Sequence, residues 1–263
     1  MGEPEQTGDE PGTNPAVSTS LGSRLVNVYV SPAEVFDEIK ASPPNAANWW
    51  VPLALVISTW IVYWMIVFSQ PGIIQGMREV QEKNMQAQVD AGKITRQQAD
   101  QAEEVIDKVM GPTFMKVMGI LRALLVSPAA LFFTALIVWL VGVKVFHGAF
   151  SYMRAVEAAG LASMISIVEV IVRLLLVVIY VNPSITPSPA LLVSHFDQTN
   201  KLHIFLALLD LGSLWYVGVM AVGLSRLSGA SFLKSALWGY GIWAIMTGVI
   251  FGFVVVAMMF GHK

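Results

Sequence analysis

The sequence of 263 residues contains no cysteine, which excludes disulfide bridges, thiolate nucleophiles and cysteine-bound metals. Charged residues are also scarce: Asp, Glu, Lys and Arg make up 13% of the chain, about half of their share in soluble domains. The net charge of -2 lacks the basic excess that would favour nucleic acid as a partner. No cluster of Lys and Arg is dense enough for a polybasic lipid patch.

Hydrophobic residues, in contrast, make up 55% of the chain. Charges crowd residues 1–40 and 75–116 and are almost missing from long windows elsewhere. A bilayer core about 30 Å thick requires about 20 mostly apolar residues per helix. The windows that meet this requirement are 49–69, 118–146, 156–181, 202–224 and 233–260. The sequence therefore predicts an all-α, polytopic membrane protein with five transmembrane helices.

The N-terminal region precedes the first window. Residues 1–23 are acidic and rich in Gly, Pro, Ser and Thr, which is typical of a disordered tail, and they show no signal peptide. Residues 24–47 form an amphipathic segment, in which Ser31 is expected to cap a helix, Pro32 to start it and Glu34 to complete a capping box. Its apolar face consists of Val35, Phe36 and Ile39. Packing of this face on the bundle is favoured over docking of a partner.

Residues 48–263 form the predicted membrane domain, with an insertion at 72–112. The insertion is polar with helical periodicity, and Gly92 separates its halves. In the second half, Thr95 and Gln98 fit a capping box. An apolar stripe follows: Ala99, Ala102, Ile106 and Val109. We expect a soluble helical hairpin between helices one and two, whose mixed charges form a solvated face or, alternatively, bind a partner.

The distribution of basic residues predicts the orientation. The side that holds the N-terminus collects Arg24, Lys40, Lys144, Arg154, Arg226 and Lys234. The loop 183–201 and the C-terminus, on the other side, carry one Lys each. Because basic residues accumulate on the cytoplasmic side, the N-terminus is expected in the cytoplasm and the C-terminus outside. The hairpin then faces outward.

Three ionisable residues in the predicted spans form a candidate polar cluster. At a rise of about 1.5 Å per residue, Arg173 lies about 10–12 Å and Asp210 about 12 Å inside the same boundary. Glu169 lies one turn from Arg173 on the same helix face. The cluster is either a structural pair that orients helices or part of a proton or ion relay. Polar residues gather toward one side and no pair of broken helices is visible, which favours the structural interpretation.

Motifs of common enzymes are missing: the sequence has no HExxH, GxSxG, Walker-type loop or GxGxxG. His195 and Asp197 are too few ligands for a metal site. We therefore expect no enzyme activity, no catalytic residue, no cofactor and no metal.

The expected partners are the lipid bilayer and membrane or peripheral proteins of unknown identity. In the last window, small residues recur at Ala244, Gly248 and Gly252, a spacing that allows close approach of helices. Packing within the bundle is favoured there, and a homo-oligomer is the alternative.

Two segments carry a resemblance to a known family. The stretch VYVSPAEVFDEIKASPPNAANWWVPL resembles the opening of Yip1-domain proteins, where an S-P pair, here Ser31 and Pro32, precedes a short amphipathic helix and a Trp/Pro-containing start of the first span. The stretch LLDLGSLWYVGVMAVGLSRLSGASFLKSALWG is similar to that family's fourth span and following loop, with Asp210 and Trp215 at pattern positions. The resemblance covers about residues 25–255.

The resemblance implies five spans and a cytoplasmic N-terminus. Eukaryotic family members are components of early secretory traffic that associate with Rab-type GTPases through longer cytosolic regions. The short acidic N-terminus and the hairpin here resemble the prokaryotic branch instead, which has no established activity. The expected protein is a non-enzymatic membrane-organising or adaptor component in a bacterial cytoplasmic membrane. The alternative is a small transporter or channel that uses Glu169, Arg173 and Asp210.

Overall fold

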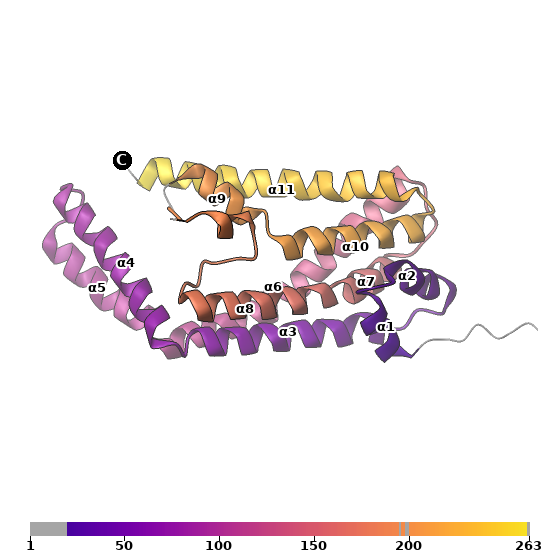
Figure 1. Ribbon diagram of the computed structural model, residues 1–263, viewed down its shortest axis with the longest axis horizontal. Coiled ribbons are helices and arrows are strands. Elements are labelled where there is room, and N and C mark those ends of the chain that lie inside the picture. The colour runs from indigo at the N-terminus through magenta and orange to yellow at the C-terminus, as the bar shows by residue number, and fades with distance from the viewer. Residues whose placement is uncertain (1–19, 195, 198–199, 262–263) are drawn as a thin grey trace, which may run out of the picture.

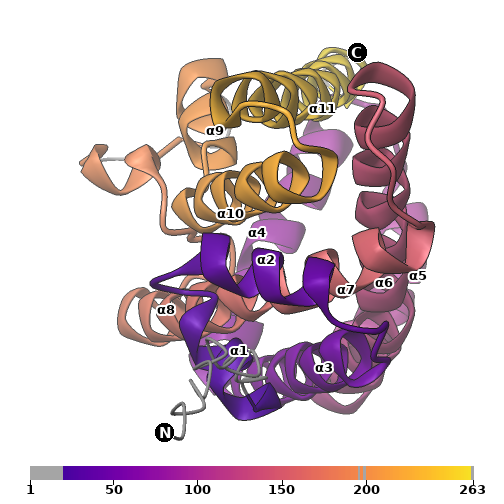
Figure 2. The same ribbon diagram turned by 90° about the vertical axis from the view of Figure 1, so that its right-hand side faces the viewer.

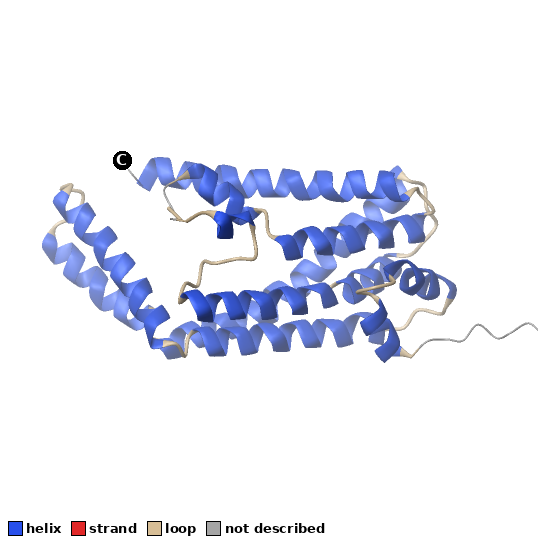
Figure 3. Cartoon of the chain, in the orientation of Figure 1, coloured by secondary structure: helices blue, strands red, loops and turns tan. Residues whose placement is uncertain are grey.

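A computed structural model describes residues 20–194, 196–197 and 200–261. The predicted tail therefore lies almost wholly outside the described residues, as does His195. Within the described part the regular elements are all helical (Figures 1 and 3). They are α1 Leu21–Asn27, α2 Pro32–Ala41, α3 Ala47–Val67, α4 Pro71–Asp90, α5 Arg96–Val109, α6 Pro112–Leu140, the π-helical η1 Val141–Val145, α7 Tyr152–Ala162, α8 Met164–Tyr180, the 3-10 turn η2 Pro189–Leu192, α9 Lys201–Leu208, α10 Leu211–Ser228 and α11 Phe232–Gly261.

Four helical segments of the described chain are long and apolar enough to cross a membrane: α3, α6 with η1, α7 with α8, and α11. The pair α9 and α10 adds a fifth if it is counted as one span bent by 42°. The protein is therefore an integral membrane protein with four to five candidate spans. The long helices lie lengthwise beside one another, with α1 and α2 at one end and α4 and α5 at the other (Figure 1).

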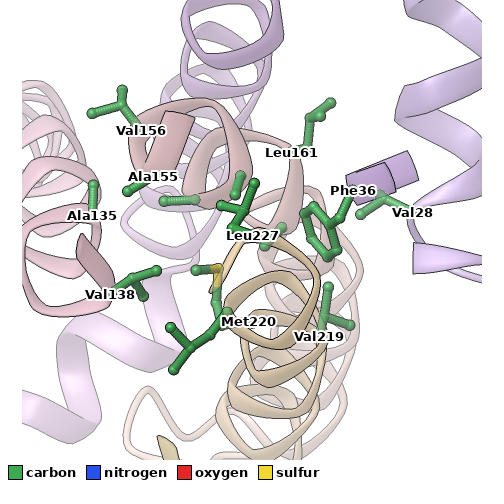
Figure 4. Close-up of a cluster of buried hydrophobic side chains, with 14 of the residues drawn as sticks. Val28, Phe36, Ala135, Val138, Ala155, Val156, Leu161, Val219, Met220 and Leu227 are labelled. Atoms are coloured by element: carbon green, nitrogen blue, oxygen red, sulfur yellow. The ribbon is translucent and has the colours of Figure 1, made fainter. Parts of the chain in front are cut away.

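The interior of the bundle is centred on α7, which contacts α2, α3, α6 and α10. Small residues make this possible, because they let neighbouring backbones approach closely. A Cβ atom added at Gly160 would lie 2.4 Å from the Cα of Trp49. Figure 4 shows the main cluster of buried side chains, in which Val138 of α6, Ala155 of α7 and Met220 of α10 come together.

The N-terminal helix α2 packs on the bundle as predicted. Val35, Phe36 and Ile39 are buried, and the Phe36 ring lies 3.3 Å from the position that a Cβ of Gly223 would occupy. Pro32 is in the first turn, but the predicted capping box is wrong because the Ser31 side chain makes no cap hydrogen bond. The Ser31 backbone, at φ -133° and ψ 54°, lies outside the extended region that N-cap residues usually adopt.

The segment between α3 and α6 consists of α4 and α5, which contact each other. The capping box of α5 is confirmed: the Thr95 hydroxyl accepts from the N–H of Gln98 at 3.2 Å, and the Gln98 side chain accepts from the N–H of Thr95 at 2.9 Å.

Two expectations about the last spans are wrong. The window 202–224 was expected to be one helix, but α9 ends at Leu208 and α10 begins at Leu211. The small-residue stripe on α11 does not pack within the bundle, because Ala244, Gly248 and Gly252 are exposed. A Cβ added at Gly248 or Gly252 would meet no atom within 4 Å.

Candidate functional site

The break between α9 and α10 is organised by Asp210. Asp210 is the N-cap of α10, and its Oδ1 accepts a hydrogen bond from the N–H of Ser213 at 3.0 Å. The Ser213 hydroxyl in turn donates to the Asp210 carbonyl oxygen at 2.8 Å. The first N–H groups of a helix lack partners within the helix, and a bilayer offers no water to replace them. The Asp210 carboxylate thus gives a hydrogen-bond partner to a backbone N–H that the helix break leaves without one.

The second oxygen of the same carboxylate faces α8. The Nη2 of Arg173 donates to Asp210 Oδ2 at 3.0 Å and to Glu169 Oε1, also at 3.0 Å. All three side chains are mostly buried, with Asp210 the most enclosed at 11% exposed. The structure therefore brings together the three residues of the candidate cluster. One guanidinium faces two carboxylates, and the positive end of the α10 dipole adds further stabilisation to Asp210.

Gly212 allows α8 and α10 to approach closely enough for these contacts. A Cβ at this position would lie 2.2 Å from the Cγ of Glu169. Such a distance is incompatible with any larger residue unless Glu169 moves. The glycine, the capping carboxylate and the ion pair therefore form one local arrangement.

Two cavities lie close to this cluster but do not include it. The first, of about 240 Å³, lies between α3, α6, α8 and α10 and is lined in part by Arg122, Ser127 and Ser166. The second, of about 210 Å³, lies between α6, α10 and α11. Thr134 and Tyr216 line both cavities, whereas Glu169, Arg173 and Asp210 line neither.

A second polar network, not anticipated from the sequence, lies at the end of the bundle that carries α1 and α2. Its centre is Glu157 of α7, which is 1% exposed. The Glu157 carboxylate accepts from Arg154 Nη1 at 2.9 Å, from the Asn45 backbone N–H at 2.8 Å and from Asn48 Nδ2 at 3.3 Å. Arg154 also donates to the carbonyl oxygen of Ser42. A buried carboxylate is thus surrounded by donors, as its burial requires.

The network extends into the N-terminal segment. Arg24 donates from Nη1 to Asn48 Oδ1 at 3.3 Å and from Nε to Glu38 Oε2 at 3.2 Å. Arg24 is 6% exposed, so this cation is part of the interior. One signal in the sequence indicated this network: Arg154 and Glu157 are three residues apart, a spacing that places them on the same helix face. The other members of the network come from α1, α2, the loop after α2 and the start of α3, and periodicity does not predict contacts between such distant segments.

The family-pattern positions also lie around the N-terminal segment and α10. The ring of Trp215 lies 6.0 Å from that of Tyr29, and the Tyr29 hydroxyl donates to the Met164 carbonyl oxygen at 2.6 Å. Trp215 thereby contacts the turn before Ser31 and Pro32. Asp210, the fourth position, is the N-cap of α10 and lies five residues before Trp215 in the sequence.

The described residues contain no group of three or more His, Asp or Glu side chains that could hold a metal ion. The arrangement near Asp210 can neutralise charge, cap a helix and fix the distance between α8 and α10.

Comparison with known proteins identifies the family. The profile of the Yip1 domain matches residues 26–255, which is most of the chain. No curated protein matches, and no solved structure matches. The matched region includes α2, Glu157 with its partners Asn45, Asn48 and Arg154, and the Asp210 cluster. The chain belongs to the Yip1-domain family.

Proposed function

We propose that this protein is a non-enzymatic membrane-organising or adaptor component of the Yip1 type, with five spans, in a bacterial cytoplasmic membrane. In this proposal residues 24–47 are an amphipathic segment docked on the bundle and residues 48–263 are the membrane domain. The N-terminus is cytoplasmic and the C-terminus lies outside. The observation that carries the proposal is the pairing of Arg173 with both Asp210 and Glu169, none of which lines either of the two nearby cavities.

A transport pathway requires charged groups that water and substrate can reach. Here one carboxylate oxygen of Asp210 is used by the helix cap and the other by Arg173. A group engaged in this way stabilises the broken span and is poorly suited to exchange protons. The cluster therefore acts as a structural clamp between α8 and α10.

Proton flux into liposomes that contain the purified protein tests this proposal. We expect the same low flux for the wild type, for Asp210→Asn and for liposomes without protein. Flux in the wild type that is lost in Asp210→Asn would show that the cluster conducts and that the clamp proposal is wrong.

The hairpin 72–112 is proposed to lie outside the membrane on the outer side. Support comes from its position at the end of the bundle opposite to α1 and α2 (Figure 1). Added protease is expected to cleave at Lys93 in intact cells. Protection in intact cells combined with cleavage in inverted vesicles would reverse the proposed orientation.

A second copy of the chain is proposed to pack on α11 through Ala244, Gly248 and Gly252. The exposure of this stripe supports the proposal, because small residues facing outward offer a surface for close helix approach. The chain has no cysteine, so any disulfide-linked dimer of the variant Gly248→Cys must form through position 248. We expect a dimer band on a non-reducing gel for Gly248→Cys and none for the control Val249→Cys, whose side chain is also exposed.

The bent span favours one alternative, a small transporter or channel. Broken helices with ionisable residues at the break are typical of substrate sites in transporters. Asp210 lies at such a break, and Ser213, which it caps, lines the cavity between α6, α10 and α11. Ion or proton flux that depends on Arg173 and Asp210 would favour this alternative.

A further inference from the structure

The cavity between α6, α10 and α11 is an elongated apolar groove that the polar cluster does not use. Its walls come from three helices, and Figure 2 shows α10 and α11 beside each other with α6 across from them. Val138, Met220 and Trp238 are among the apolar side chains that line it. A groove of this kind within a membrane domain is open to one class of abundant apolar ligand, the acyl chains of the bilayer.

The length of the groove matches one leaflet. Along α11 it extends from Ser235 to Met246. At a rise of about 1.5 Å per residue this is about 16 Å, roughly half of a hydrocarbon core of about 30 Å. The start of α11 lies at the end of the bundle that carries α1 and α2 (Figure 1). The groove therefore crosses the leaflet on that side.

A polar group without a partner marks the end of the groove at the start of α11. Ser235 is 0% exposed and its hydroxyl has no hydrogen-bond partner among the described residues. It lies in the first turn of α11, which starts at Phe232. A buried hydroxyl without a partner costs free energy, so a ligand oxygen that accepts a hydrogen bond from it would be favoured. The ester carbonyl of a phospholipid is an acceptor found at this depth.

Two cations flank the same end. Lys234 directly precedes Ser235, and Lys144 follows the groove-lining Val141 by about one helical turn. Both lysines are exposed and lie near the ends of their spans, so we expect their ammonium groups in the headgroup region. Basic residues at a membrane surface attract anionic lipids. The two lysines lie far apart in the sequence. The fold places Lys144 after α6 and Lys234 at the start of α11, on two helical walls of the same groove.

We propose that the groove binds one acyl chain of an anionic phospholipid, with the headgroup phosphate near Lys144 and Lys234 and an ester carbonyl accepting a hydrogen bond from Ser235. The groove contributes the apolar contact, and the lysines contribute selectivity for the negative headgroup. This site is independent of the role proposed for Asp210.

Native mass spectrometry of the delipidated full chain in detergent tests the proposal, because it counts bound lipids and reports the oligomeric state. We expect phosphatidylglycerol to bind about tenfold more tightly than phosphatidylcholine of the same chain length. The double variant Lys144→Gln, Lys234→Gln should lose this preference. The charge-matched control Lys83→Gln, Lys201→Gln changes exposed lysines elsewhere and should keep it.

Ser235→Ala separates a ligand role from a structural role. Because the hydroxyl has no partner among the described residues, its removal should leave the unfolding temperature without lipid unchanged. Binding of phosphatidylglycerol should weaken several-fold. Equal binding of both lipids by the wild type, or unchanged binding in Ser235→Ala, would overturn the proposal. A dimer that excludes lipid from the wild type would also overturn it, because a second copy would then fill the groove.

Discussion

Arg173 and Asp210 form an ion pair of 3.0 Å that joins the middle of α8 to the N-terminus of α10. The Asp210 carboxylate also caps α10 through the N–H of Ser213. A charged residue in an apolar run is thereby engaged on both oxygens. Its position in the chain is explained by the break in the helix, which needs an acceptor, and by the arginine opposite, which compensates its charge.

Substitution of Gly212 by alanine tests how closely α8 and α10 must approach. The added Cβ would lie 2.2 Å from Glu169 Cγ, so the ion-paired side chain must shift. Overpacking of this kind costs about 1–3 kcal/mol, and we expect thermal unfolding in detergent at a lower temperature. Gly241→Ala is the matched control, because no atom lies within 4 Å of a Cβ there. Equal stability of the two variants would show that the close approach is not required.

Neutralisation of Glu157 should release the N-terminal segment. Glu157→Gln keeps the size of the side chain but leaves the buried guanidinium of Arg154 without its ion pair. Loss of one partner of a buried pair costs about 3 kcal/mol or more. We expect faster hydrogen exchange of the amides in residues 24–47. Glu34→Gln, which removes an exposed carboxylate from the same segment, should leave exchange unchanged. Similar exchange in both variants would argue against a role of the network in docking.

Alkaline pH should weaken the contact made by Tyr29. Burial raises the pKa of the Tyr29 hydroxyl above its ordinary value of 10.0. The protonated hydroxyl donates to the Met164 carbonyl oxygen, so its stabilisation is fully present below about pH 10. It is lost as the pH rises through the raised pKa. The wild type should therefore lose stability more steeply above pH 10 than Tyr29→Phe. Identical profiles would mean that the hydroxyl does not contribute.

Much of this architecture could be predicted from the sequence. The long apolar windows predicted the spans, because a bilayer imposes a minimum length on them. Helical rise alone placed Arg173 and Asp210 at the same depth, and the structure joins them. The break at Asp210 was missed because the neighbouring leucines continue the apolar run. Asp210 itself was the signal of a cap, because aspartate is among the residues preferred at the N-cap position.

Other features could not be predicted, because they depend on contacts between distant segments. Glu157 lies inside the apolar window 156–181, but its donors Asn45 and Asn48 lie in the loop before α3 and at the start of α3. The outward direction of Gly248 on α11 depends on which face of that helix meets α10. Helical periodicity identifies a stripe of small residues without identifying what faces it.

The stability of Arg173→Gln, Asp210→Asn and the double variant in detergent tests the central claim most directly. Asparagine can still cap α10, and Arg173 then keeps Glu169, so Asp210→Asn should cost less than Arg173→Gln, which leaves two carboxylates uncompensated. We predict a loss of about 3 kcal/mol for Arg173→Gln, and a double variant more stable than the sum of the single losses implies by about 1 kcal/mol or more. Unchanged stability in all three variants would contradict the structural clamp and identify Asp210 as a solvated group.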